Sequence, residues 1–408
     1  MTVDPSVPVL LVRIGHYPLH HGAVGAVRTL GRLGVPVHVI AEGRFTAAAL
    51  SRHRAGRIVW PTTGSEPVEH LVRGLREIAS SLPGRPVAVA TDDEAAILLA
   101  EHAGVLSEHL LLPPVPPGLP RLLASKHEMF RLCRRHGIPA PESRLVTSRD
   151  HVDEIAREFA FPVVVKNSEP WVRLAAPVVE RSTVVDTPRE LRELAAGWPD
   201  APYALVQEYL PRSESTDWIA HVCCDARGGI VAGFTGVKVR SWPPHVGVTT
   251  YAYSVRNPEL AELTARLCGE SGYSGIADLD WRLDHRDGRY KLLDFNPRVG
   301  AQFRLFETDA GIDVVRAHYL TLTGQAVPPG VQVEGRRIIV ENLDIPARIA
   351  YRGGGERRHR VPEGGGREFA WLTADDPLPG LVTAARSARP VMRRVARLFG
   401  GMRRPRQG

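Results

Sequence analysis

Acidic, amide and basic side chains follow one another in the segment "KLLDFNPR", residues 291–298. Asp294, Asn296 and Arg298 are each separated by one residue and come directly after an apolar run. If Leu292–Asn296 is a strand, Asp294 and Asn296 lie on the same face, because side chains alternate with period two. The segment therefore predicts a strand face that carries a carboxylate and an amide, with a guanidinium just beyond it.

A second strand pattern supplies further carboxylates to this face. The preceding segment "IADLDW" alternates Asp278 with Asp280, and "HRDGRY" between the two segments is typical of a hairpin turn. Close like charges repel and lose hydration on burial, so such a face is costly unless a cation neutralises it. Carboxylate and amide oxygens suit Mg²⁺ or Mn²⁺ better than zinc. A solvated hairpin face with cross-strand salt bridges is the alternative.

The chain contains only four lysines, against 48 arginines. The lysine ammonium is a compact point charge and the guanidinium a planar fork, so a surviving lysine marks a site where only the compact charge fits. Lys126 begins an expected helix, Lys166 ends the buried-type strand "FPVVVK", and Lys238 lies in "GVKVR"; the fourth is Lys291. Lysines at strand ends beside a magnesium-type carboxylate cluster are suited to a polyphosphate. Chance survival on the surface is the alternative.

The first part of the chain alternates strand and helix patterns, beginning with a strand at 7–15 and a helix at about 23–34. Such alternation favours a doubly wound parallel sheet. Asp92 and Asp93 follow a strand of this part, where open sheets of this class bind ligands. N-capping of the next helix explains the two acids equally well. The proline-rich segment 112–120 is the best domain boundary.

The second part of the chain reads as α+β with antiparallel strands. It opens with an expected helix at about 122–136, and strand patterns dominate residues 218–298. From residue 331 onward, glycine-rich and charged sequence predicts loops.

Composition indicates a globular protein of about two or three domains. Hydrophobic residues make up 43% and charged residues 24% of the chain, and the longest apolar runs are strand-sized, so no membrane-spanning helix is expected. The N-terminal segment lacks the basic region of a signal peptide. Four cysteines, two of them adjacent at Cys223 and Cys224, indicate reduced thiols. The cytoplasm is therefore the expected compartment.

The net charge of +7 comes largely from residues 388–408, which hold seven arginines and no acid. No aromatic-rich basic stretch or zinc-finger spacing accompanies this charge, so nucleic acid is not an expected partner. The basic tail is expected to be solvated. A short amphipathic helix that binds a membrane surface or a partner is the alternative, without stable membrane insertion.

Five segments, in order, resemble the ATP-grasp superfamily, most closely its carboxylate–amine ligase-like branch, over about residues 8–325. They are "LLVRIG" to "VPVHVIAE", "ASKHEMFRLCRRHGIPAPES", "FPVVVK", "LVQEYL", and "GIADLDW" to "YKLLDFNPR". The resemblance implies an α/β and α+β fold, with an N-terminal doubly wound parallel-sheet (pre-ATP-grasp) domain at 1–118 and a two-lobed ATP-grasp domain at 119–330. The lobes would span about 119–206 and 207–330. Residues 331–408 would form a C-terminal extension with a basic tail.

The resemblance also implies ATP as cofactor and gives roles to the cationic residues. Lys126 and Lys166 would contact the ATP phosphates. Arg298 would steady the transferring phosphoryl group or an acyl phosphate. Lys238, with Arg240 nearby, is a candidate for the same negative charge.

Further residues match the family's nucleotide and metal positions. The adenine would be lined by Gln207, Glu208, Tyr209 and Leu210. The ribose hydroxyls would be held by Asp217 or by Glu214. One or two Mg²⁺ (or Mn²⁺) ions would be bound by Asp280, Asp294 and Asn296.

The sequence departs from the family pattern at three places. Ser125 precedes Lys126 where an aspartate is common, and Asp294 stands where a glutamate is commoner. Residues 167–182 contain no glycine, although a glycine-rich phosphate lid is expected there. Arg173 is a candidate to replace the backbone groups of that lid.

The implied activity is that of an ATP-dependent carboxylate–amine ligase that forms an amide through an acyl phosphate and releases ADP and phosphate. Its partners would be small carboxylic acids and amines, of which amino acids or short peptides are the expected class. A homodimer is left open. A carboxylase that uses bicarbonate and an inactive ATP-binding sensor or scaffold are the alternatives. A nicotinamide dehydrogenase is disfavoured, because "GHYPLHHGAVG" is no clean dinucleotide-binding motif.

Three histidines, His16, His20 and His21, lie in the loop after the first strand. They are candidates for substrate contact, but polar surface is the commoner role of such residues.

Overall fold

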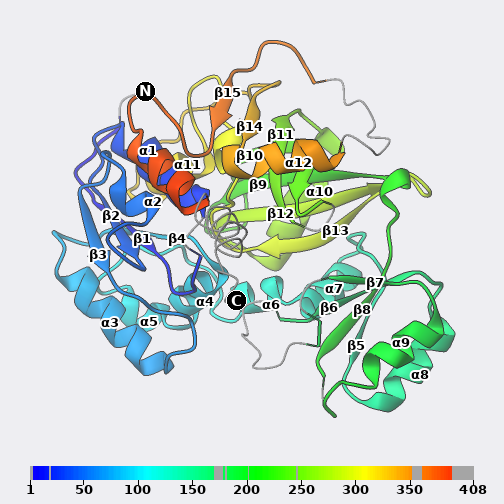
Figure 1. The fold of residues 1–408 in the computed structure, drawn as a ribbon. Coiled ribbons are helices and arrows are strands. Elements are labelled where there is room, and N and C mark those ends of the chain that lie inside the picture. Colours follow the sequence, from blue (N-terminus) through cyan, green and yellow to red (C-terminus); the bar gives the residue numbers. More distant parts are fainter. Residues whose placement is uncertain are drawn as a thin grey trace, which may run out of the picture.

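The N-terminal part forms a four-stranded parallel sheet (Figure 1). The computed structural model describes residues 3–17, 20–169, 178–179, 182–200, 202–244, 247–351 and 361–387. The sheet has the order β3-β2-β1-β4, with β1 (Val9–Val12), β2 (Val37–Ala41), β3 (Gly56–Val59) and β4 (Val87–Ala90). Its helices are α1 (His21–Gly31), α2 (Ala47–Leu50), α3 (Val68–Ser80), α4 (Asp93–Glu101) and α5 (Ala103–Leu106).

Alternation along β1 places helices on both faces of this sheet. Val9 and Leu11 share a hydrophobic core with α1, whereas Leu10 and Val12 share another with α3 and α4. Successive side chains of a strand point to opposite faces of the sheet, so apolar side chains on both faces require helices that pack on each face. The expected doubly wound arrangement is therefore confirmed.

Two helices, α6 (Leu119–Ala124) and α7 (Lys126–Arg135), follow the proline-rich segment. The sequence predicted one helix over about 122–136. The structure separates them at Ser125, whose backbone is extended and whose side chain caps α7. The break places Lys126 at the first position of a helix.

A small lobe contains a second four-stranded sheet, at the lower right of Figure 1. Its strands are β5 (Ser143–Val146), β6 (Val163–Asn167), β7 (Thr183–Val185) and β8 (Ala204–Glu208), in the order β5-β8-β6-β7 and all antiparallel. Helices α8 (Arg149–Glu158) and α9 (Pro188–Ala195) share its hydrophobic core.

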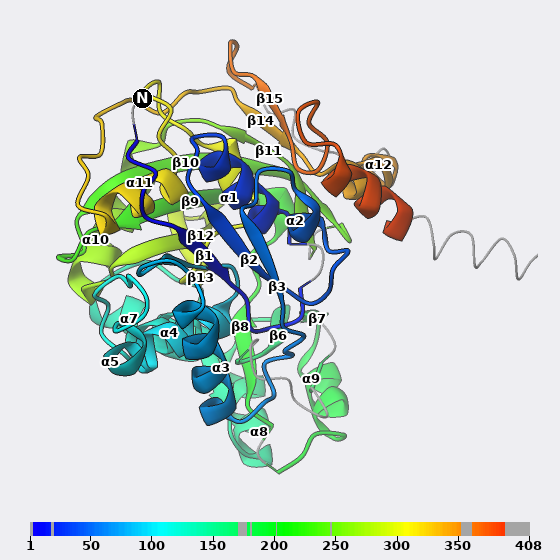
Figure 2. The same ribbon diagram turned by 90° about the vertical axis from the view of Figure 1, so that its left-hand side faces the viewer.

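A seven-stranded sheet forms the centre of the molecule (Figure 1). Its order is β13-β12-β9-β10-β11-β14-β15. The strands are β9 (Ser215–Cys224), β10 (Ile230–Trp242), β11 (Val248–Ser254), β12 (Gly275–Asp284), β13 (Arg289–Asn296), β14 (Arg337–Ile339) and β15 (Arg367–Phe369). One face shares its core with α7 and α10 (Pro258–Ser271). The other shares its core with α11 (Val314–Leu322) and with the N-terminal part, which lies in front of this sheet in Figure 2.

The part after residue 331 is more regular than its sequence predicted. The three-residue strands β14 and β15 extend the large sheet, and α12 (Glu341–Ala350) packs on β10 and β11. Strands this short carry almost no period-two signal, and the pairing of β14 with β11 and of β15 with β14 is decided only in the tertiary structure. The domain limits given above remain a prediction.

Two further expectations concern the whole chain. All four cysteines are buried free thiols, as the sequence indicated. Of the described helices, none is both long and apolar enough to span a membrane.

Candidate active site

The hairpin of β12 and β13 pairs the acids in the expected way. Asp280 stands directly opposite Asp294, and Asp278 directly opposite Asn296. The turn at residues 285–288 closes the hairpin, and a register shift follows immediately after Asp280. The predicted cluster of carboxylates and an amide is therefore present at the end of the hairpin.

Three of the four lysines converge on this cluster from different elements. Lys126 of α7 pairs with Asp294, and Lys238 of β10 pairs with Asp280. Lys166, at the end of β6, donates to the side-chain oxygen of Gln207 at 2.8 Å. The sequence contains no local signal for this convergence, because the three lysines are separated by at least 40 residues.

The fourth lysine has a different surrounding. Lys291 is buried in β13 and pairs with Asp284 at 2.8 Å and with Glu208 at 3.2 Å. It supports the hairpin and the end of β8, so only the other three lysines lie where a polyphosphate could bind.

Burial and mutual charge shift the pKa values in this cluster. Burial lowers the pKa of Lys166 to about 8. Burial also raises the pKa of Asp280, and the neighbouring carboxylates Asp278 and Asp294 add to that effect. For Asp294 the opposing charges of Lys126 and Lys166 outweigh burial, so its pKa is lowered. These opposing effects suit a site in which the lysines bind an anionic ligand and the carboxylates bind a cation.

A cavity of about 570 Å³ lies beside the cluster, between the small lobe and the large sheet. Lys166, Lys238, Asp280 and Asp294 are among its lining residues. All four residues expected to contact adenine also line it, namely Gln207, Glu208, Tyr209 and Leu210. A cavity of this size is typical of small-molecule and cofactor sites.

Asp217 and Glu214 are placed differently from one another. Asp217 lines the cavity, and its carboxylate lies 2.6 Å from Arg282 and 3.0 Å from Arg212. These arginines keep its pKa low although burial opposes them. Glu214 is exposed in the short helix η1 (Arg212–Glu214) and is not among the described lining residues. Of the two candidates for the ribose, the geometry favours Asp217.

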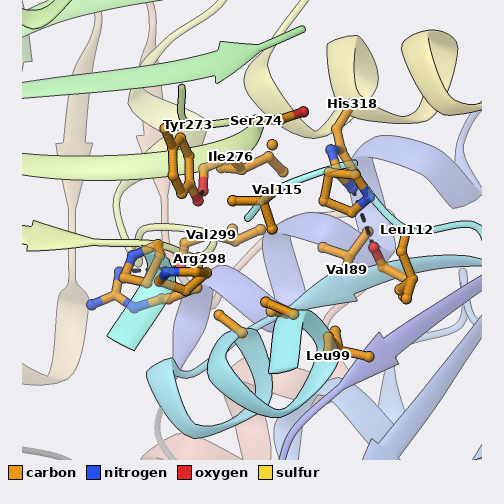
Figure 3. A pocket seen from close by; sticks show the side chains of 18 residues that line it. Val89, Leu99, Leu112, Val115, Tyr273, Ser274, Ile276, Arg298, Val299 and His318 are labelled. Atoms are coloured by element: carbon orange, nitrogen blue, oxygen red, sulfur yellow. Dashed lines mark hydrogen bonds between the residues drawn. The ribbon is translucent and has the colours of Figure 1, made fainter. Parts of the chain in front are cut away.

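Arg298 lies between the hairpin and the N-terminal part. Its Nη1 donates to Asp278 at 3.0 Å, and its Nε lies 3.5 Å from Asp93. The next residue, Val299, donates its backbone N–H to Ala90 at the end of β4. Figure 3 shows Arg298 and Val299 at one side of a small cavity of about 50 Å³, with His318 at the other. The N-terminal sheet thus helps to hold the loop that carries Arg298.

The two adjacent acids after β4 divide the roles that the sequence left open. Asp92 is the N-cap of α4, where it accepts from Ala95 N at 2.7 Å, and it also accepts from the backbone of Ile14 and Gly15. Asp93 instead faces Arg298. Only the tertiary structure separates the capping residue from the residue that lies at the site.

Sequence reasoning missed His221 and assigned no role to Asp278. It assigned no partner to His221, a fully buried residue of β9 whose Nε2 lies 3.0 Å from Asp278. Burial would raise the pKa of Asp278, but His221 and Arg298 hold it well below its usual range. Period-two alternation had placed Asp278 on the same face as Asp280, but it gave Asp278 no role. No local pattern could have identified His221.

Two of the three histidines after the first strand, His20 and His21, are not ordinary polar surface, whereas His16 is exposed as the commoner role predicts. His21 is buried, and the ring nitrogens of His20 are enclosed without a hydrogen-bond partner among the described residues. Burial lowers the pKa of His20 to about 3 and that of His21 to about 4, so both rings are neutral near pH 7. Arg298 and Asp278 act on the pKa of His20, which places that ring near them.

The donor set at the cluster fits a magnesium ion held together with a nucleotide. Asp280 and Asp294 are cross-strand partners, and the Nδ2 of Asn296 donates to the backbone oxygen of Asp278 at 3.1 Å, so its oxygen is available as a ligand. Within the described ranges, no three His, Cys, Asp or Glu side chains are grouped to hold a metal ion by themselves. Mg²⁺ commonly takes one or two carboxylates and completes its shell with phosphates and water.

The expected phosphate lid lies mostly outside the described residues. This applies to Arg173, the candidate replacement for the lid's backbone groups.

Comparisons with known proteins find no matching family model. The chain is 24% identical to D-aspartate ligase of Enterococcus faecium over 270 residues, which are 63% of this chain and 64% of that protein. It is 27% identical over 239 residues to D-alanine–D-alanine ligase B of Pseudomonas putida, covering 51% of this chain and 67% of the relative. The match thus spans less than two thirds of the D-aspartate ligase.

Solved structures share the fold over most of the chain. N5-carboxyaminoimidazole synthetase from Staphylococcus aureus matches with a TM-score of 0.59 and 12% identity over 80% of each chain. An L-amino acid ligase from Bacillus licheniformis matches with a TM-score of 0.55 and 16% identity over 78% of this chain and 75% of its own. At these identities the likeness concerns the fold.

Proposed function

Because the chain belongs to the ATP-grasp superfamily, we propose that it is an ATP-dependent carboxylate–amine ligase. The observation that carries the proposal is the convergence of Lys126, Lys166 and Lys238 on the pair Asp280 and Asp294 beside a nucleotide-sized cavity. Such an arrangement neutralises the phosphates of ATP during transfer. The names of the ligase relatives support amino acids as the substrate class.

The reaction proceeds in two steps. An oxygen of the substrate carboxylate bonds to the γ-phosphorus of ATP, the bond from that phosphorus to the bridging oxygen breaks, and ADP leaves with the electron pair. The amine nitrogen then bonds to the acyl carbon, inorganic phosphate leaves, and the nitrogen loses a proton. A carboxylate is a poor electrophile, and conversion to an acyl phosphate removes that obstacle.

The chain's own residues position and neutralise the reacting groups. Lys126 and Lys166 bind phosphate oxygens, and Lys238 and Arg298 neutralise the charge of the transferred group. The end of β8 contacts adenine, and Asp217, fixed by two arginines, binds the ribose. Bound at Asp280, Asp294 and Asn296, Mg²⁺ supplies further neutralisation of phosphate charge. Proximity and electrostatic stabilisation supply the catalysis without a side-chain nucleophile.

A screen of substrate pairs tests the proposal. The purified full chain is incubated with ATP, Mg²⁺ and pairs of amino acids or short peptides, and ADP release and product masses are recorded. We expect ADP release that requires both an acid and an amine, and a product mass equal to their sum less one water. Release of ADP that depends on bicarbonate alone would favour a carboxylase, and no release with any pair would contradict a ligase.

Asp294→Asn is the variant that connects this activity to the site. We expect ADP release to be lost while the melting temperature is retained, because the carboxylate is partly exposed and its loss leaves no core cavity. Asp287→Asn, in the turn of the same hairpin, is the matched control and should keep activity. Equal activity of the two variants would refute the role of Asp294.

A further inference from the structure

Arg240 of β10 is held by an acid from the C-terminal part of the chain. Its Nε and Nη2 donate to the two carboxylate oxygens of Asp344 in α12, at 3.0 and 3.1 Å. The side chains of Arg240 and Asp344 are 15% and 6% exposed. Such a fork-to-fork pair fixes the plane of a guanidinium as well as its position.

Two residues of β11 complete the surroundings of this pair. The guanidinium carbon of Arg240 lies 4.4 Å from the ring centroid of Tyr251, and Thr250 donates its hydroxyl to Asp344 at 3.2 Å. The register between β10 and β11 shifts on both sides of Arg240. A bulge re-aims the side chains of its strand. Arg240 is therefore constrained by its backbone, by an aromatic face and by a carboxylate.

Arg240 nevertheless belongs to the wall of the nucleotide cavity. It lines that cavity together with Lys238, whose ammonium pairs with Asp280. Its third nitrogen, Nη1, makes no hydrogen bond to another described residue. If the pair of Arg240 and Asp344 only stabilised the fold, Arg240 would not need to line a ligand cavity next to Lys238. Its position there indicates a role towards the ligand.

The position of Asp344 is itself fixed from outside the site. Helix α12 follows β14, which pairs with β11, and Asp344 donates its backbone N–H to Val340 at 2.8 Å. At the start of α12, the carboxylate of Glu341 accepts from the backbone of Trp371, and Asn342 accepts from the Trp371 indole at 2.9 Å. These contacts anchor the helix that presents Asp344.

We propose that Asp344 is a positioning residue that orients Arg240 towards the group transferred from ATP, and that α12 is therefore part of the active site. The inference rests on the proposed function and deepens it. An unpaired arginine in this wall would sample many rotamers and would lose that freedom on binding. Asp344 removes that freedom in advance, and preorganised charge is most effective on the transferring group.

Binding of a mimic of the transfer state tests this role without knowledge of the acid or the amine. The affinity of the full chain for ADP alone is compared with that for ADP plus aluminium fluoride, both with Mg²⁺, in wild type and in Asp344→Asn. We expect the variant to bind ADP within about twofold of wild type but ADP with aluminium fluoride about tenfold more weakly, as displaced positioning groups cost one to two orders of magnitude.

A double-mutant cycle separates positioning from general stabilisation. Arg240→Lys keeps the charge but lacks the fork, so it should show the same selective loss, and the double variant should lose little more than either single variant. Arg240→Lys also serves if Asp344→Asn does not fold. Glu334→Gln, which removes the partly exposed partner of Arg256, is the matched control and should change neither affinity.

Two outcomes would overturn the proposal. One is an equal loss of both affinities in Asp344→Asn, and the other is a lower melting temperature with both affinities retained, since each would make the pair merely structural. Failure of the ligase proposal is recognised separately, because it is read from the substrate screen and this binding test contains no acid or amine.

Discussion

Lys166 is a partly buried cation for which we propose a phosphate ligand. Its ammonium donates to Gln207 at the end of β8, and burial lowers its pKa to about 8. The unfolded chain keeps the ordinary value of about 10.4. Without a ligand, the folded protein therefore holds this proton less tightly than the unfolded chain does. Phosphate oxygens favour the charged form and reverse that preference.

Nucleotide affinity should consequently fall as the pH rises through about 8. Deprotonated Lys166 cannot neutralise phosphate, so the ADP dissociation constant should rise by up to about tenfold per pH unit above that pKa. The same group makes the unliganded fold more stable as the pH rises from about 8 to about 10.4, because the unfolded chain binds more protons there. Calorimetric titration with ADP from about pH 7 to about pH 9.5 checks the first effect.

Lys166→Arg is the control for this pH dependence. Its guanidinium stays charged throughout, so affinity should be weaker than in wild type but flat with pH. A wild-type affinity in this variant would refute the argument that the site requires the compact ammonium. A pH profile that the substitution leaves unchanged would show that another group titrates.

At the scale of elements, a capped helix and a hairpin deliver the charged groups. Lys126 occupies the first turn of α7, where the helix dipole disfavours a cation. Ser125 stands there in place of the family's common aspartate, and its hydroxyl accepts from Glu128 N at 3.5 Å. The residue thus ends α6, begins α7 and directs Lys126 towards Asp294.

Ser125→Ala should lower the free energy of unfolding by about 1 kcal/mol, the usual cost of a lost N-cap. It should also weaken ADP binding, because Lys126 follows the cap directly. Urea denaturation and ADP titration measure the two effects. Ser148→Ala is the matched control, since Ser148 is the N-cap of α8 but its side chain makes no capping hydrogen bond. Similar losses of stability in both variants would argue against the cap at Ser125.

At the scale of the whole molecule, a buried ion pair connects helix α1, near the N-terminus, with the C-terminal part of the described chain. Arg28 of α1 and Asp376 lie 2.9 Å apart and are 2% and 1% exposed. Asp376 also accepts from Ser51 Oγ at 2.7 Å, and Arg28 donates to the backbone of Trp371 at 2.7 Å. The segment that anchors α12 is thereby attached to the N-terminal sheet.

Asp376→Asn should destabilise the protein by about 3 kcal/mol, because it leaves a buried arginine without its counter-charge. The neighbouring Asp375→Asn is the control. Asp375 pairs with Arg32 in a largely exposed contact, so its loss should cost less than about 1 kcal/mol. Denaturant unfolding of both variants provides the comparison. If the two lose equal stability, the buried pair does not secure the segment.

Local patterns allowed much of the site to be predicted. Period-two alternation and a turn motif were sufficient for the pairing of Asp280 with Asp294. Lysine scarcity singled out four residues, of which the fold brings three together and places Lys291 elsewhere. The same patterns could not distinguish the capping Asp92 from Asp93 at the site, because adjacent residues in a loop share every local signal.

The sequence by itself determined most elements before residue 331, since strand and helix periodicity, turn residues and caps act over a few neighbours. It did not predict the break between α6 and α7, nor β14, α12 and β15. It also determined which charges lie at the ends of those elements. Only the tertiary structure decided their partners. Asp344 reaches Arg240 across 104 residues, and Asp376 reaches Arg28 across 348. Such contacts depend on how whole sheets and helices pack. A short window of sequence therefore cannot predict which distant residues will meet.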